Sequence, residues 1–129
     1  MARGRRILIV DDDAAARAAL RLVLERSGHV VVMAGNGDDG VELTRTMSPD
    51  VVLVAVGSPG FDGHRVAERI RATPDGGDPF LVALSGLIPV EAHRKAREAG
   101  FDTYVLKPAD PGLLTALLAV PRLTLSGIA

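Results

Sequence analysis

The chain has 129 residues, of which 47% are hydrophobic and 24% are charged, and these proportions are those of one folded domain. Its net charge of −1 gives no large electric field, so neither nucleic acid nor an anionic membrane is expected as a partner. The absence of cysteine excludes disulfides and thiolate nucleophiles, and no apolar run suits a signal peptide or a membrane span, so we expect a cytoplasmic protein.

The first half of the chain predicts three strands, each followed by a helix. Apolar runs predict strands over residues 6–10, 29–34 and 51–56. Asp13 is the expected N-cap of a first helix that ends at Gly28. A turn over residues 35–37 leads into a second helix from about Asp39 to Met47, and Asp62 caps a third helix that runs to about Ala72.

The second half repeats the same alternation. It predicts strands over residues 80–84 and 102–106, a helix that starts near Pro89 and stops at Gly100, and a last helix opened by Asp110 and Pro111. Strict alternation, with continuous apolar runs over 6–10 and 51–56, predicts an α/β fold: a parallel sheet with helices on both faces. We expect one domain over residues 5–120 and a short tail over 121–129.

Polar residues gather where the predicted strands end, which is where ligands bind in a sheet of this kind. The first strand is followed by Asp11, Asp12 and Asp13, the fourth by Ser85, and the fifth by Lys107. Capping explains Asp13. Asp11 and Asp12 repel one another and need a cation, for which a hydrated Mg²⁺ and Lys107 are both suitable.

The other polar residues receive structural interpretations. Asp62 is a helix cap, and nothing in the sequence activates Ser58 as a nucleophile. The histidines lack the spacing of metal ligands and are expected at or near the surface: His29, His64 and His93. The arginines of the third helix are expected to form a solvated face: Arg65, Arg69 and Arg71.

The combined spacing of these motifs resembles the receiver domain of bacterial two-component response regulators. The motifs are Asp11-Asp12, the SPGFDG loop over 58–63, Ser85-Gly86, Glu98-Ala99-Gly100 and Lys107-Pro108. The resemblance covers residues 5–118 and implies a flavodoxin-like five-stranded parallel sheet in the order 2-1-3-4-5. It also implies a phosphorelay function, in which an aspartate ending the third strand accepts a phosphoryl group from a histidine kinase beside a bound Mg²⁺.

The resemblance assigns roles to six positions. Asp11 and Asp12 match the family's acidic pair, and Gly57 matches the residue whose backbone carbonyl binds the metal. Ser85 matches the switch hydroxyl, Tyr104 the switch aromatic residue, and Lys107 the lysine that pairs with the phosphoryl oxygens. In the family, the surface formed by the fourth helix, the fifth strand and the fifth helix binds partners. The resemblance therefore implies that a histidine kinase, another signalling protein or a second copy binds through residues 90–118.

The sequence departs from the family at the phosphoacceptor position, which is Ala55. A methyl group neither accepts a phosphoryl group nor binds a metal. The charges of Asp11, Asp12 and Lys107 sum to −1, where an acceptor aspartate would make the sum −2, so we expect weak Mg²⁺ binding. Without a phosphoryl partner, Lys107 is expected to pair with Asp11 or Asp12 and hold the site in one arrangement. We therefore expect a non-enzymatic pseudo-receiver that works by contact.

Two alternatives remain open from the sequence. The chain is equally that of an ordinary phosphorylated receiver whose acceptor has been replaced by alanine, because one residue separates the two readings. A small nucleotide- or flavin-binding α/β domain is a weaker alternative, since three aspartates after the first strand repel phosphate. A hydrolase with an aspartate nucleophile is disfavoured by Ala55.

Overall fold

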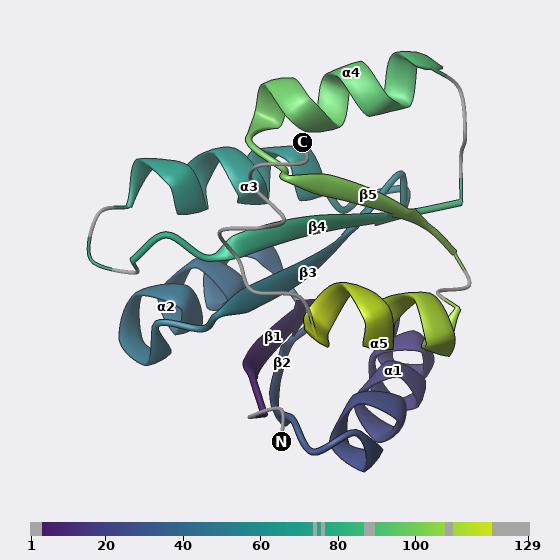
Figure 1. Cartoon of the computed structure of the whole chain (residues 1–129). Coiled ribbons are helices and arrows are strands. Elements are labelled where there is room, and N and C mark those ends of the chain that lie inside the picture. The colour runs from purple at the N-terminus through teal and green to yellow at the C-terminus, as the bar shows by residue number, and fades with distance from the viewer. Residues whose placement is uncertain (1–3, 74, 76, 87–89, 108–109, 120–129) are drawn as a thin grey trace.

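The computed structural model describes residues 4–73, 75, 77–86, 90–107 and 110–119 (Figure 1). The predicted tail over 121–129 and the expected helix start at Pro89 lie outside these residues. In chain order the elements are β1 (Arg6–Val10), α1 (Ala14–Arg26), β2 (Val30–Ala34), α2 (Gly37–Met47), β3 (Val51–Val56), α3 (Gly63–Ala72), β4 (Phe80–Ser85), α4 (Val90–Ala99), β5 (Thr103–Leu106) and α5 (Pro111–Ala119).

The strands form one parallel sheet in the order β2-β1-β3-β4-β5, which confirms the predicted fold. The register aligns the strands at their carboxyl ends. Val10 of β1 lies opposite Val54 of β3, and Ser85 of β4 lies opposite both Val56 of β3 and Leu106 of β5. The residues that follow β1 and β5 are therefore brought to one edge of the sheet.

Each face of the sheet packs against its own set of helices, because successive strand residues point to opposite faces. Ile7, Ile9 and Leu53 belong to a core with Leu24 of α1 and Leu118 of α5. Leu8, Val10, Val52 and Val54 belong to a second core with α3 and α4. Figure 1 shows the same division, with α1 and α5 on one side of the sheet and α2, α3 and α4 on the other.

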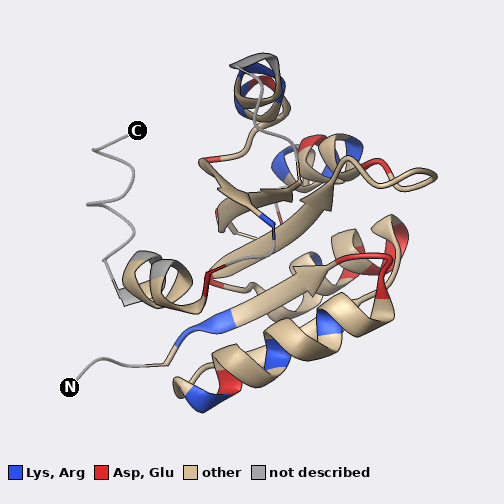
Figure 2. Cartoon of the chain, turned by 90° about the vertical axis from the view of Figure 1, so that its right-hand side faces the viewer, with Lys and Arg blue, Asp and Glu red and all other residues tan. Residues whose placement is uncertain are grey.

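The strands carry almost no charge, as befits a sheet covered on both faces. Figure 2 shows Lys, Arg, Asp and Glu on the helices and connecting loops, and within the strands only β1 begins with a charged residue, Arg6. All residues of β3 and β4 are buried. Charge near the sheet is thus confined to the loops at its ends, where the candidate site lies.

The ends of the helices follow from their capping residues. The Asp13 carboxylate accepts hydrogen bonds from the backbone N–H groups of Ala15 and Ala16, and Asp62 accepts one from Arg65, so both predicted caps are confirmed. The predicted start of the second helix was two residues late. Asn36 accepts from the N–H of Asp39 at 2.8 Å and so caps a helix that already begins at Gly37.

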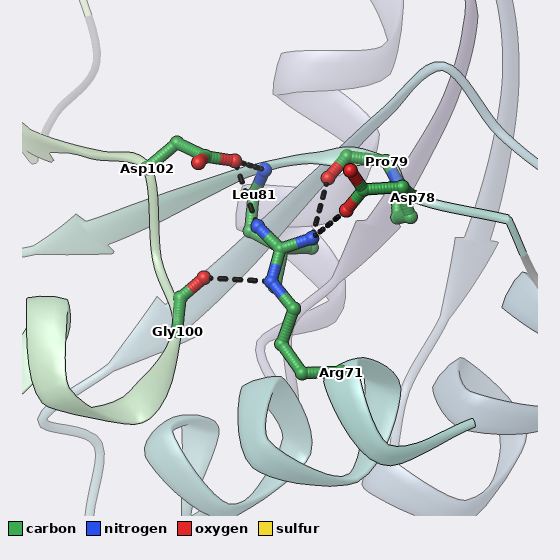
Figure 3. Close-up of polar contacts among 6 residues, drawn as sticks. All are labelled: Arg71, Asp78, Pro79, Leu81, Gly100 and Asp102. Carbon is green, nitrogen blue, oxygen red and sulfur yellow. Dashed lines mark hydrogen bonds and ion pairs between the residues drawn. The ribbon is translucent and has the colours of Figure 1, made fainter. Parts of the chain in front are cut away.

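The expectation of a solvated arginine face on α3 is wrong for Arg71, whose side chain is only 26% exposed. Its guanidinium donates to the carbonyl oxygens of Gly100 and Pro79, each at 2.9 Å, and to the carboxylates of Asp78 and Asp102, each at 2.8 Å (Figure 3). Arg71 therefore joins the end of α3 to the residues that lead into β4 and β5.

Candidate functional site

The carboxyl ends of the strands bring four of the predicted site residues together. Asp11 directly follows β1, Ala55 is the penultimate residue of β3, Ser85 ends β4, and Lys107 directly follows β5. The backbone N–H of Lys107 donates to the carbonyl oxygen of Ser85 at 2.7 Å, which fixes the lysine backbone against β4. Asp11 and Ser85 are each 2% exposed, so the acid and the hydroxyl are both buried polar groups.

Asp11 and Lys107 form an ion pair across the sheet. The Lys107 Nζ lies 3.1 Å from Oδ2 of Asp11, whose side chain is 3% exposed against 28% for the lysine. The other carboxylate oxygen, Oδ1, accepts the backbone N–H of Asp13 at 3.0 Å. The expected pairing of Lys107 with one of the two acids is thus confirmed, and the partner is Asp11. Asp12, in contrast, is exposed.

Arg17 is a further charged residue at this edge, and the sequence interpretation did not include it. Its Nη1 donates to the backbone carbonyl oxygen of Asp11 at 2.7 Å. The guanidinium also packs over Gly35, where an added Cβ would lie only 3.0 Å from Nη1. With Arg17 counted, two positive side chains balance the charges of Asp11 and Asp12. The signal available in the sequence was an arginine within the run of alanines that begins α1.

Ala55 occupies the end of β3 as a fully buried methyl group, with an exposed fraction of 0%. Ala55 comes two residues after Leu53, and Asp11 comes two residues after Ile9. By strand alternation the two side chains therefore point to the same face of the sheet. The start of α3 presses on this strand end, because a Cβ added at Gly63 would lie 2.0 Å from the carbonyl oxygen of Ala55. Ala55 is therefore closely packed, and its side chain has no polar atom.

An apolar groove of about 360 Å³ extends from the ion pair along α1. Besides Asp11 and Lys107 it is lined by Ala16, Ala19, Leu20, Val23 and Leu84. Apolar surroundings strengthen the attraction between the two charges and raise the cost of leaving either one alone. The pair is consequently a fixed feature of the site in this arrangement.

Tyr104 lies on the other side of β5, where it packs against the core shared with α3 and α4. Its ring stacks on His93 of α4, with centroids 4.4 Å apart and an interplanar angle of 23°. The hydroxyl oxygen is buried and, among the described residues, has no hydrogen-bond partner. His93 is an exposed residue, which agrees with its predicted surface position.

The residues at this edge do not form a ready Mg²⁺ site in the observed arrangement. Mg²⁺ binds through one or two carboxylates and retained waters in near-octahedral geometry. Both oxygens of Asp11 are engaged by Lys107 and Asp13, and position 55 supplies no ligand. Within the described part of the chain, no three His, Cys, Asp or Glu side chains are placed to hold a metal.

Comparison with known proteins identifies the family. The model of the response regulator receiver domain matches residues 7–119. The chain belongs to this family. Receiver domains are signalling domains of two-component systems that interact with histidine kinases and effector domains, and as a family they bind Mg²⁺ at the phosphorylation site. The weaker alternative of a nucleotide- or flavin-binding domain has no support from this match.

Several curated relatives are longer than this chain. The transcriptional regulatory protein AfsQ1 of Streptomyces coelicolor is 40% identical over 110 residues, which are 85% of this chain and 48% of the relative. An uncharacterized 14.6 kDa protein of Leptolyngbya boryana is 34% identical over 81% of this receiver and 80% of its own length. The receiver thus spans about half the length of AfsQ1 but most of the Leptolyngbya protein.

Solved structures agree with the fold. A putative response regulator from Chloroflexus aurantiacus superimposes with a TM-score of 0.80 at 30% identity, covering 89% of this receiver and 94% of that chain. The chemotaxis protein CheY4 of Vibrio cholerae gives a TM-score of 0.81 at 22% identity, covering 88% and 96%, and shows the fold alone. No helix in the described ranges is both long and apolar enough to span a membrane.

Proposed function

We propose that this receiver domain does not accept a phosphoryl group and that it signals through protein contact in a single resting arrangement. The observation that carries the proposal is Ala55, a buried methyl group near the carboxyl end of β3, the strand that pairs with β1, which Asp11 follows. Phosphoryl transfer to a protein needs a nucleophilic oxygen at the acceptor position. The same chemistry follows whether Ala55 is the natural residue or a replacement of an acceptor aspartate.

Neighbouring acids are poor substitutes for the missing acceptor. Asp62, the next acid along the loop, accepts the backbone N–H of Arg65 at 3.0 Å and caps α3. Asp11 is held by Lys107, and Asp13 caps α1. Each of these carboxylates already has a role that a phosphoryl group would disrupt.

Weak Mg²⁺ binding is part of this proposal. Asp11, Asp12 and the Gly57 carbonyl are the ligands that would hold the ion, because they lie at the ends of β1 and β3. A bound Mg²⁺ supplies positive charge that neutralises phosphoryl oxygens in the family's reaction. Here Lys107 already neutralises Asp11, so less negative charge is left at the site to attract the ion.

Partner contact is proposed for residues 90–118, which include α4, β5 and most of α5. A groove of about 660 Å³ on this surface is lined by His93, Ala96, Arg97, Phe101, Asp102, Thr103 and Tyr104. Leu106 at the end of β5 is 43% exposed and, with Val30 of β2 at 61%, is one of the two exposed large apolar side chains of the described strands. A histidine kinase, another signalling protein or a second copy of the domain would bind here.

Treatment with acetyl phosphate and Mg²⁺ tests the missing acceptor. We expect the intact mass of the wild-type chain to stay unchanged. The Ala55→Asp variant should gain the mass of one phosphoryl group that hydroxylamine removes, because Ser85 and Lys107 remain in place. Any phosphoryl group gained by the unmodified chain, with Ala55 in place, would show that another residue is the acceptor and would overturn the proposal.

A further inference from the structure

We propose that β2, the strand at one edge of the sheet, pairs antiparallel with β2 of a second copy of this chain and joins two five-stranded sheets into one. The two-fold axis passes beside Val32, so that Val31 of each copy lies opposite Met33 of the other. This contact is separate from the partner surface over residues 90–118, and it does not depend on whether position 55 accepts a phosphoryl group.

The first step of the argument is the open side of β2, which among the described strands pairs only with β1. The N–H of Val30 donates to the carbonyl oxygen of Arg5 at 2.9 Å, and the carbonyl oxygen of Ala34 accepts the N–H that follows β1 at 3.1 Å. Backbone groups alternate in direction along a strand, so those of Val31 and Met33 point away from β1. Such an edge is a template for one more strand.

The second step is that β2 lacks the residues that usually keep sheet edges apart. Proteins protect an edge strand with charged side chains or proline, and the sequence of β2, VVVMA, contains neither. Val30 is 61% exposed, a larger fraction than that of Leu22 or Leu106. The next three side chains of the strand are partly exposed. Pairing with another strand would therefore remove apolar side chains from water as well as satisfy backbone groups.

The third step is the distribution of charge beside β2, which favours a second copy as the occupant. The helices α1 and α2 lie on opposite faces of the sheet, and both run opposite to the strands that they connect. Figure 2 shows red ahead of α1 and blue at its last residue. Exposed acids precede α1 or lie in the first turn of α2, and an exposed arginine lies in the last turn of each helix: Asp12, Asp13, Asp38 and Asp39, and Arg26 and Arg45.

Antiparallel pairing turns one copy end for end, so the acidic end of each copy lies beside the basic end of the other. Parallel pairing would place like charges together, which costs free energy. Glu25 and Glu42 each pair with an arginine of their own helix, Arg21 and Arg45. With Arg26 added, the basic end of the two helices keeps a net positive charge. The charges therefore fit a second copy in the antiparallel orientation.

The register follows from the outward backbone groups. When Val31 lies opposite Met33 of the other copy, the two residues can exchange two hydrogen bonds. The two-fold axis repeats this pair, so all the outward groups of both residues are satisfied, and the contact closes as a dimer. Val32 then faces Val32 of the other copy in a non-hydrogen-bonded pair, with Cα atoms about 4.5 Å apart.

Cysteine cross-linking tests both the contact and its register, because the chain contains no cysteine. Val32→Cys places two thiols beside the axis, and a Cα separation of about 4.5 Å lies within the range of disulfides. We expect mild oxidation with oxidised glutathione to produce a covalent dimer on non-reducing electrophoresis.

Val30→Cys is the matched control for cross-linking by random collision. Its two thiols would lie four residues apart along the paired strands, about 13 Å, although the side chain at position 30 is the more exposed. We expect little cross-linking of this variant. Equal or faster cross-linking at position 30 than at position 32 overturns the proposal.

Sedimentation equilibrium measures the association without a cross-link. We expect a reversible dimer of the wild-type chain, and Val31→Pro should raise its dissociation constant at least tenfold, equivalent to about 1.4 kcal/mol. Proline at position 31 removes only an outward N–H and leaves the bonds to β1 in place. Val31→Thr keeps the N–H and the shape of the side chain, so it should associate like the wild type.

Two outcomes of this measurement contradict the proposal. One is a wild-type chain that stays monomeric at every concentration measured, and the other is a dimer of equal strength in Val31→Pro, which would place the contact elsewhere. Circular dichroism establishes whether Val31→Pro is folded. If it is not, the comparison of Val32→Cys with Val30→Cys decides.

Discussion

At the residue scale, the sequence identified the acidic edge but not how its charges are shared. Three consecutive aspartates predicted a cap and a cation-binding pair, and Asp13 is the cap. Asp11 is buried and Asp12 is exposed. Which of the two acids is turned toward β5 depends on the tertiary arrangement, and no local sequence pattern encodes it. Arg17 was missed because it binds a backbone carbonyl, and any residue type presents that oxygen.

His29 provides a prediction at the same scale. Its Nδ1 accepts the backbone N–H of Arg5 at 2.9 Å. Burial, and secondarily the positive charge of Arg5, lower the pKa of His29 below its ordinary value. The neutral ring is thus favoured in the folded state, so its stabilising effect is fully present above the unfolded pKa of about 6.5 and is lost as the pH falls through the lower folded pKa.

Urea unfolding between about pH 8 and about pH 5 measures this effect. The wild-type free energy of unfolding should decline more steeply on acidification than that of His29→Gln, which keeps an acceptor but does not titrate. His64→Gln is the matched control for the loss of an imidazole ring. Identical pH profiles for His29→Gln and the wild type would show that protonation of His29 does not oppose folding.

At the scale of elements, hydrophobic periodicity and capping residues were sufficient to predict all ten helices and strands of the described chain. The errors were confined to ends. The helix after Asn36 was placed two residues late because the two glycines around it suggested a turn, whereas the Asn36 side chain caps the helix. The pairing of Lys107 with an acid after β1 was predicted, but the contacts of Arg71 were not: Arg71 reaches Gly100, 29 residues away, and looks in the sequence like its solvated neighbours.

Arg71 should therefore be worth more to stability than the other arginines of α3. Its planar group serves four acceptors in fixed directions, and the Asp102 oxygen that it binds also accepts the N–H of Leu81 at 2.9 Å. A lysine ammonium does not reproduce that fork. We expect Arg71→Lys to lower the free energy of unfolding by about 2 kcal/mol, because charge-assisted hydrogen bonds to half-buried groups are lost.

Arg65→Lys is the matched control for this measurement by urea denaturation. Arg65 is 67% exposed and lies 3.6 Å from Glu68, so its replacement should cost less than about 0.5 kcal/mol. Equal losses in the two variants would mean that the Arg71 contacts contribute no more than a solvent-exposed pair.

At the scale of the whole molecule, our proposal is that the residues matched to the family's switch are present while the group that would drive them is absent. Lys107 and Ser85 are linked at the sheet edge, and Tyr104 lies one element away on the α4 side of β5. A ligand moves a conformational equilibrium only through a difference in affinity between two states. If position 55 is the acceptor position, as we propose, a phosphoryl analogue finds a methyl group there in place of a carboxylate, and so supplies no difference in affinity.

Beryllofluoride, added together with Mg²⁺, should consequently cause no change beyond that caused by Mg²⁺ alone. We expect unchanged amide resonances over residues 90–107 and an unchanged sedimentation coefficient, because no signal reaches the proposed partner surface. The Ala55→Asp variant is the positive control, in which the same reagent should shift these resonances. A tenfold or larger change in self-association of the wild type, about 1.4 kcal/mol, would mean that Ser85, Tyr104 and Lys107 still act as a switch. Since Lys107 already pairs with Asp11, the one buried acid among the residues that the structure describes, indifference to the reagent is the expected result.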